Sequence, residues 1–118
     1  MKITIITVVY NAEQHIRDCI KSVLEQTYID KEYILIDGNS TDKTYQIAQE
    51  YQEEIAVLVS EPDKGMYDAL NKGIGLATGK VIGILNADDI LADREVIAKV
   101  ASTFATEKVD AVYGDLNY

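Results

Sequence analysis

The sequence predicts an α/β domain, a three-layer sandwich in which a mainly parallel sheet is flanked by helices. Apolar runs of strand length alternate with segments whose apolar residues recur at helical period, the pattern of parallel strands joined by crossover helices. The strand-length runs are rich in Ile, Leu and Val with little alternation, as expected when helices cover both faces of the sheet. A length of 118 residues suits a single domain, residues 1–118, with one core.

Five strands are expected, each an apolar run bounded by polar residues or glycine. They are Ile3 to Tyr10, Tyr33 to Asp37, Ile55 to Ser60, Val81 to Leu85 and Ala111 to Gly114. The first run is too short to span a membrane and has no small-residue cleavage site after it, so we interpret it as a buried strand rather than a signal peptide. The only proline, Pro62, falls in the loop after the third strand.

The first two helices are predicted from apolar stripes at helical spacing. The stripe of the first consists of Ile16, Cys19, Ile20, Val23 and Leu24. Asn11 and Gln14, three residues apart, resemble a capping box at its start. The second helix is predicted from about Asp42 to Tyr51, with Ser40 or Thr41 as its N-cap.

The third helix is predicted from about Met66 to Ala77 and the fourth after Asp93, which would cap it. Small residues recur every four positions in the third helix, which leaves a smooth strip where backbone can approach the sheet; they are Ala69, Gly73 and Ala77. Gly79 is the expected stop of that helix. The expected core face of the fourth helix consists of Val96, Ile97, Val100 and Phe104.

Composition excludes some classes of function. With 11 basic and 20 acidic residues the formal charge is -9, so a surface that grips nucleic acid through phosphate contacts is not expected. An anionic ligand would instead need a metal ion, a helix amino terminus or a single placed lysine. Cys19 is the only cysteine, so no intrachain disulfide can form, and its place on an apolar stripe indicates packing rather than reactivity.

Polar clusters follow the first four strands, at the edge where open parallel sheets bind ligands. The clearest follows the fourth strand, whose apolar run stops at Asn86-Ala87-Asp88-Asp89. Asn86 and Asp88 lie two apart, so in extended backbone their side chains leave the same face. Because hard divalent cations prefer carboxylate and carbonyl oxygens, this cluster is a candidate cation site. The alternative is that Asp88 and Asp89 cap a turn.

Several short motifs occur in order along the chain. They are Val9-Tyr10-Asn11, Ser22 through Thr27, Asp37 through Thr44, Ser60 through Gly73, Ala77-Thr78-Gly79 and Leu85 through Asp89. Together they resemble the amino-terminal half of family 2 glycosyltransferases, inverting enzymes with the GT-A fold of nucleotide-diphospho-sugar transferases. The resemblance covers nearly all of the chain, so we expect a donor-binding half that lacks the acceptor-binding segment bearing the catalytic base.

The resemblance implies roles for residues that follow the first three strands. Val8 and Tyr10 would line the base pocket, and Asp37 would hydrogen-bond the base or ribose. A plain turn-capping aspartate is the alternative for Asp37. Many relatives carry a second acid where this chain has Gly38, so that contact is not expected here. Lys64 would assist the phosphates; its alternative is a solvated surface lysine.

The family's metal motif, Asp-any-Asp, maps onto Asn86-Ala87-Asp88. Asn86 and Ala87 would contact the nucleotide-sugar, and Asp88 would contact the divalent ion with Asp89 beside it. The implied cofactor is Mn²⁺ or Mg²⁺, which would bridge the pyrophosphate of a UDP-, GDP- or dTDP-sugar and offset the charge of the leaving group.

The implied reaction is inverting sugar transfer to a saccharide or lipid-linked acceptor in polysaccharide or glycolipid synthesis. Asp68 and Asn71, three residues apart, either face the same cleft or form the solvent side of the third helix. The only histidine, His15, is interpreted as a surface or packing residue, and no catalytic base is assigned.

Three other classes of protein share features with this sequence. A phosphoacceptor receiver domain would need an acid pair after the first strand, where this chain has Tyr10-Asn11, and a dinucleotide-binding module would need glycines there. The main alternative is a truncated, non-catalytic nucleotide-binding or interaction module of the same fold. By resemblance, the protein is expected to be cytoplasmic, including a peripheral position at the inner face of the cell membrane, and a homodimer is a further expectation.

Overall fold

The computed structural model describes residues 1–62, 65–107 and 112–115, and it has nine helices and strands in these ranges. In chain order they are β1 Ile3–Val9, α1 Ile16–Leu24, β2 Lys31–Asp37, α2 Thr44–Gln49, β3 Val57–Ser60, α3 Met66–Leu76, β4 Val81–Ile84, α4 Val96–Glu107 and β5 Val112–Asp115. The predicted alternation of strands and helices is confirmed, with bounds that shift by a residue or two. Ala111 and the side chain of Phe104 lie outside the described residues.

The strands form one parallel sheet in the order β3-β2-β1-β4-β5. β1 lies in the middle and pairs with β2 on one side and β4 on the other, so the chain order reverses at β1. In open parallel sheets this reversal leaves a crevice at the carboxyl ends of the strands, where ligands bind. The loops after β1 and β4 therefore flank the position where a ligand is expected.

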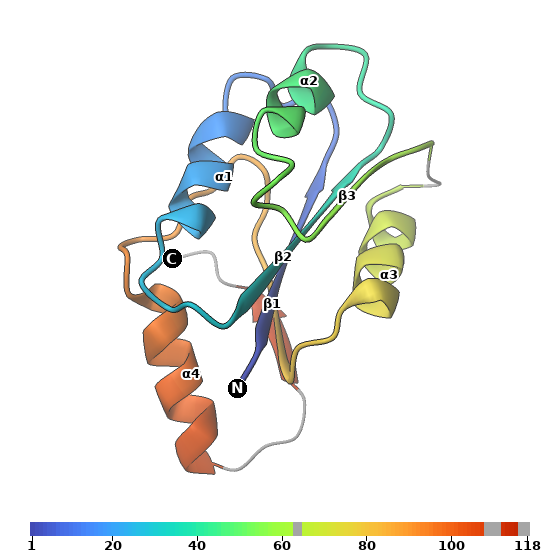
Figure 1. The fold of residues 1–118 in the computed structure, drawn as a ribbon. Helices are drawn as coiled ribbons and strands as arrows, with labels where there is room; N and C mark the ends of the chain where they lie inside the picture. The colour runs from blue at the N-terminus through green and yellow to red at the C-terminus, as the bar shows by residue number, and fades with distance from the viewer. Residues whose placement is uncertain (63–64, 108–111, 116–118) are drawn as a thin grey trace.

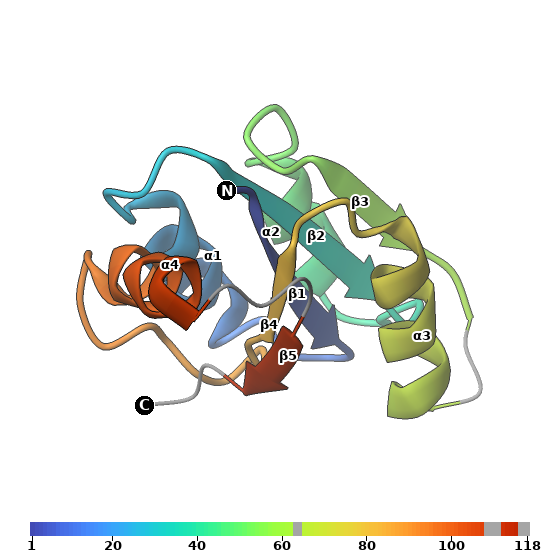
Figure 2. The same cartoon turned by 90° about the horizontal axis from the view of Figure 1, so that it is seen from below.

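Helices cover both faces of the sheet, as the sequence predicts. Figures 1 and 2 show α1 and α4 on one face and α3 on the other. Alternate residues of β1 serve the two layers: Ile5 belongs to the core cluster shared with α1, α2 and α4, and Ile6 belongs to the cluster under α3. No helix in the described part of the chain is both long and apolar enough to cross a membrane.

The small residues of α3 allow that helix to lie close to the sheet. Ala69 is fully buried against Ile6, and a Cβ added at Gly73 would lie 2.8 Å from Cγ2 of Ile6. The predicted smooth strip is therefore present at both positions. Gly75, two residues further along the helix, faces open space.

Gly73→Ala is expected to destabilise the fold by about 1–3 kcal/mol, because the added methyl group must displace Ile6 from a close-packed contact. Gly75→Ala is the matched control: it lies in the same helix with no atom near its Cβ, so alanine should stabilise by about 0.5–1 kcal/mol through helix propensity. Urea unfolding measures both. Equal effects of the two substitutions would contradict the close approach.

Gly79 does not act as the predicted helix stop. The helix ends at Leu76, and Gly65 is the described glycine with a positive φ. A Cβ at Gly79 would instead lie 2.5 Å from Oγ1 of Thr4, so this glycine is needed where the loop crosses the start of β1. The stop is set by Ala77, whose backbone is extended.

Helix starts follow tertiary contacts more than local capping patterns. The expected capping box at α1 is wrong, because the helix begins after His15 without a side-chain cap. Neither Ser40 nor Thr41 caps α2; instead the N–H of Thr44 donates to Oδ1 of Asp42 at 2.9 Å. Asp93 acts as expected just before α4, where it accepts a hydrogen bond from the N–H of Glu95 at 2.7 Å.

Candidate functional site

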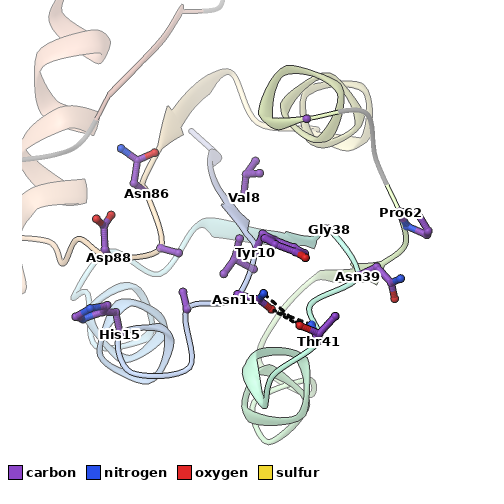
Figure 3. Close-up of a pocket in the computed structure, with 14 residues that line it drawn as sticks. Val8, Tyr10, Asn11, His15, Gly38, Asn39, Thr41, Pro62, Asn86 and Asp88 are labelled. Carbon is purple, nitrogen blue, oxygen red and sulfur yellow. Dashed lines mark hydrogen bonds between the residues drawn. The ribbon is translucent and has the colours of Figure 1, made fainter.

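The loops after the first four strands converge on one cleft of about 1080 Å³ at the carboxyl edge of the sheet. Its lining includes Val8, Tyr10, Asn11 and His15 around β1 and α1, Gly38, Asn39 and Thr41 after β2, Pro62 and Gly65 after β3, and Asn86, Ala87 and Asp88 after β4. Figure 3 shows these side chains arranged around a common space. The expected convergence of the strand-end loops is therefore confirmed.

The end of β1 supplies an aromatic surface to the cleft. The side chain of Tyr10 is 60% exposed although large apolar rings are usually covered, and Figure 3 places its ring among the other lining residues. Val8 lies beside it and packs against the cluster under α3. An exposed ring next to an aliphatic side chain can pack against the flat face of an aromatic ligand.

Asn11 joins the loop after β1 to the loop after β2. Its Oδ1 accepts from the N–H of Thr41 at 2.8 Å, and its Nδ2 donates to Oγ1 of the same residue at 3.2 Å (Figure 3). The N–H of Ala12 also donates to Oγ1 of Thr44 at 2.8 Å. Asn11 adopts a positive φ of 49°, which asparagine tolerates better than most residues. The side chain thus connects two loops instead of capping α1.

Asp37 is absent from the described lining of the cleft. It is fully buried, and its carboxylate accepts from the N–H of Ser40 at 3.0 Å, from Oγ of Ser40 at 2.5 Å and from Oγ of Ser60 at 2.7 Å. Oγ of Ser40 in turn accepts from the N–H of Asn11 at 2.9 Å. These bonds tie together the ends of β1, β2 and β3. They match the turn-capping alternative, and a contact between Asp37 and a nucleotide stays a prediction.

The loop after β4 brings Asp88 into the cleft and leaves Asp89 outside the lining. The strand pairing continues through Leu85, which is fully buried and donates to the carbonyl of Ile6 at 3.0 Å. A turn follows, closed by the N–H of Asp89 and the carbonyl of Asn86 at 3.0 Å. This turn exposes Asp88 and leaves Asp89 half-buried. The two adjacent acids are therefore not equivalent.

The donor set of the cleft fits a hard cation that takes further ligands from its substrate. Asp88 is the only carboxylate in the described lining, and neither lysine nor arginine occurs there. Within residues 1–62, 65–107 and 112–115, no three His, Cys, Asp or Glu side chains are grouped as a metal site. Mg²⁺-type ions are commonly held by one or two carboxylates together with substrate phosphates and water. Asp88 and the amide oxygen of Asn86 suit that mode of binding.

Two expectations for α3 and the loop before it have different outcomes. Lys64 lies outside the described residues, so its predicted role stays a prediction. Asp68 and Asn71 are absent from the described lining of the cleft; Asp68 forms an ion pair with Lys72 at 3.6 Å. The solvent-side alternative for these two residues is the one observed.

His15 agrees with its interpretation as a surface residue, but its place in the lining of the cleft was not predicted from the sequence. It is exposed, and it lies at the N-cap position of α1 on the wall of the cleft. Its position in the sequence could have predicted this, because the first turn of a helix that follows a strand lies at the carboxyl edge of the sheet, where the ligand cleft is expected.

Cys19 has the packing role that the sequence predicts. Its side chain is fully buried, and burial raises the pKa of the thiol to about 11. The thiol lies 3.8 Å from Oγ1 of Thr7 and 3.9 Å from the hydroxyl of Tyr33, whose pKa burial also raises. A thiol that stays protonated at neutral pH is a poor nucleophile.

Fold and site together define an α/β domain of the GT-A type, with a ligand cleft at the carboxyl edge of its sheet and an exposed carboxylate after the fourth strand. The sequence profile of glycosyl transferase family 2 matches residues 4–118. The chain belongs to that family.

Curated relatives agree with this membership. A PGL/p-HBAD biosynthesis glycosyltransferase of Mycobacterium tuberculosis is 39% identical over 102 residues, which cover 83% of this chain and 40% of the relative. The glycosyltransferase GlyG of Streptococcus pneumoniae is 30% identical over 116 residues, covering 96% of this chain and 38% of the relative. The chain thus spans about two fifths of the length of these relatives.

Solved structures show the same fold. TarS of S. aureus in complex with UDP-GlcNAc has a TM-score of 0.83 and 25% identity, over 92% of this chain and 32% of that chain. The mannosyltransferase PcManGT of Pyrobaculum calidifontis, in complex with GDP-Man and Mn²⁺, has a TM-score of 0.80 and 29% identity, over 87% of this chain and 32% of that chain.

Proposed function

We propose that this chain forms the donor site of a glycosyltransferase and binds a nucleotide-diphosphate sugar together with a divalent cation. The observation that carries the proposal is the cleft itself, which places the exposed ring of Tyr10 and the exposed carboxylate of Asp88 in one space at the reversal point of the sheet. The complexes of the structural neighbours with UDP-GlcNAc and with GDP-Man and Mn²⁺ support the ligand class.

In this proposal the nucleoside packs at the β1 side of the cleft and the diphosphate lies toward the β4 side. Val8 and Tyr10 offer apolar surface for the base, while Asn86 and Asp88 lie to the β4 side of them (Figure 3), with Ala87 in the same lining. The side chain of Asn11 joins the loop after β1 to the loop after β2, so these two loops would form one continuous wall on the nucleoside side.

The proposed cation is Mn²⁺ or Mg²⁺, held by Asp88 with help from Asn86. When bound, such an ion offsets the negative charge that builds on the departing nucleoside diphosphate. A cation suits the described lining, which has no lysine or arginine, in a chain that carries a formal charge of -9. Without a bound cation the carboxylate of Asp88 would repel the negatively charged diphosphate, and with one it would help to hold the diphosphate in the cleft.

We extend the proposal, on the family resemblance, to inverting transfer onto a saccharide or lipid-linked acceptor. The only carboxylate in the described lining is already assigned to the cation, so no residue of the described part is proposed as the acceptor's base. Work in the cytoplasm or at the inner face of the membrane, and pairing into homodimers, belong to the same extension.

Calorimetric titration tests the proposal. UDP, GDP and dTDP are titrated into the chain with Mn²⁺ present and again with excess chelator. We expect at least one nucleotide to bind with Mn²⁺ and to bind more weakly after chelation, since the described cleft supplies no cationic side chain for the diphosphate. Absence of binding to all three, with and without Mn²⁺, would overturn the proposal.

A further inference from the structure

The segment from Ser22 to Thr27 is part of the family resemblance, yet none of its residues lines the described part of the cleft. It covers the end of α1 and the turn after it. Cys19 and Ser22 lie three positions apart on one side of α1, and Gln26 follows in the turn after the helix. Apolar side chains would be enough for packing here, so the polar atoms of Ser22 and Gln26 indicate an additional role.

These polar atoms contact the chain that follows β4. The N–H of Leu91 donates to Oγ of Ser22 at 3.1 Å. Nε2 of Gln26 donates to the carbonyl of Asp93 at 2.5 Å, and its Oε1 accepts from the N–H of Ile97 at 3.0 Å. We call the contacts of Ser22 and Gln26 with residues 91–97 the α1 seam.

Two further contacts extend the α1 seam at both ends. The thiol of Cys19 lies 3.5 Å from the carbonyl of Asn86, toward the cleft. The N–H of Thr27 donates to the carbonyl of Arg94 at 2.8 Å, at the far end. Residues 86–97 are therefore held along the length of α1 from the cleft to the start of α4.

The hydrogen bonds of the α1 seam join side chains of α1 and its following turn to main-chain atoms, and they lie among buried residues. Gln26 is only 6% exposed and its Nε2 also donates to the carbonyl of Ser22 at 3.1 Å, so both ends of the amide are bonded. Leu91 is 4% exposed and Ile97 is fully buried beside these bonds. A buried hydrogen bond whose partner is removed leaves an unsatisfied group, so the seam resists displacement of the loop.

The carboxylate of Asp88 makes no hydrogen bond with the residues that the structure describes. Its position is therefore set by the main chain on either side. On the β4 side that chain is fixed by pairing of Leu85 with Ile6, and on the other side it is fixed by the α1 seam. Loosening the seam would weaken the support of Asp88 on the α4 side, where the bond between the N–H of Thr27 and the carbonyl of Arg94 would remain.

We propose that Ser22 and Gln26 are positioning residues for Asp88, which act through the main chain of residues 91–97. The inference rests on the proposed function, because it concerns how the cation-holding carboxylate is kept in place. We therefore expect loss of the seam to lower the part of the nucleotide affinity that depends on the cation. The contacts of the nucleoside with the β1 side of the cleft should be unaffected.

The test uses the full chain and titration of whichever of UDP, GDP and dTDP binds best, with Mn²⁺ and with chelator. Ser22→Ala, which removes the acceptor of one main-chain N–H, should lower the Mn²⁺-dependent gain in affinity about fivefold, the equivalent of one hydrogen bond. Gln26→Leu should lower it further. The affinity measured with chelator should stay within about twofold of the unmodified chain, because hydrogen bonds remote from the nucleoside leave its contacts intact.

Two variants sharpen the result. Gln49→Leu makes the same chemical change on the exposed side of α2 and should leave the gain unchanged. Gln26→Glu keeps an acceptor for the N–H of Ile97 but places a carboxylate oxygen against the carbonyls of Asp93 and Ser22, so it should lower the gain at least as much as Gln26→Leu. If Gln26→Leu does not fold, Ser22→Ala decides the question.

The outcomes separate the two proposals. If the unmodified chain binds none of the nucleotides, the proposed function and this inference both fail. If the unmodified chain shows a Mn²⁺-dependent gain that Asp88→Ala removes, while Ser22→Ala and Gln26→Leu keep it in full, the donor site stands and the positioning role is overturned. Equal losses with Mn²⁺ and with chelator would also overturn it, because they indicate general loosening of the cleft.

Discussion

Replacing Asp88 by alanine is expected to remove the Mn²⁺-dependent part of nucleotide binding. Asp88 is the only carboxylate in the described lining of the cleft, so its loss leaves only neutral oxygens such as that of Asn86 for the cation. Substitutions that merely disturb the support of a metal ligand cost about 10–100-fold in metal affinity, so loss of the carboxylate should cost at least about tenfold. Titration of the nucleotide with increasing Mn²⁺ measures the change.

Two companion variants separate charge from shape and one acid from the other. Asp88→Asn keeps the size of the side chain and an oxygen ligand but removes the charge, so its affinity for the ion should lie between those of the aspartate and alanine forms. Asp89→Ala removes the neighbouring acid, which lies outside the lining, and should have the smaller effect. A larger loss for Asp89→Ala than for Asp88→Ala would mean that Asp89 is the principal ligand.

Salt limits the reach of charges elsewhere on the surface, because exposed charges are screened within about 8–10 Å at ordinary ionic strength. The same argument explains how an acidic chain can hold a diphosphate at all. The charge that matters is local to Asp88 and its ion, and the formal charge of -9 is spread over the whole surface.

Sequence reasoning predicted the layers and the edge of the sheet that carries the site, because these follow from simple physical patterns. Strands buried on both faces are continuous apolar runs, as in Ile34 to Ile36, and parallel strands bring their carboxyl ends to one edge. The strip at Ala69 and Gly73 was also predictable, since helical spacing alone puts such residues on one side. These features depend on periodicity and not on distant partners.

The features that were missed depend on contacts between segments far apart in the sequence. Asn11 fits a local capping box, but the structure uses its amide to join Thr41 across about 30 residues of chain. Nothing in the local sequence around Gln26 indicates that its amide bonds residues 93 and 97. The difference between Asp88 and Asp89 likewise appears only once the turn after Asn86 is formed.

Replacing Asp37 by alanine is expected to destabilise the fold by about 3 kcal/mol or more, because several polar groups would lose a buried acceptor at about 1–3 kcal/mol each. The affected donors are the N–H and hydroxyl of Ser40 and the hydroxyl of Ser60. Urea unfolding measures the loss. Asp18→Ala is the control, since Asp18 is exposed on α1 and its removal should change stability by no more than about 1 kcal/mol.

Combining unfolding with nucleotide titration then decides between the two readings of Asp37. If the carboxylate works by tying the ends of β1, β2 and β3 together, Asp37→Asn should recover part of the stability, because its amide oxygen still accepts from Ser40 while Ser60 can reorient its hydroxyl. Nucleotide affinity should then follow stability across the two variants. A variant that keeps its stability but loses nucleotide binding would show instead that Asp37 contacts the base or ribose directly, which requires the bonds to Ser40 and Ser60 to open when the ligand binds.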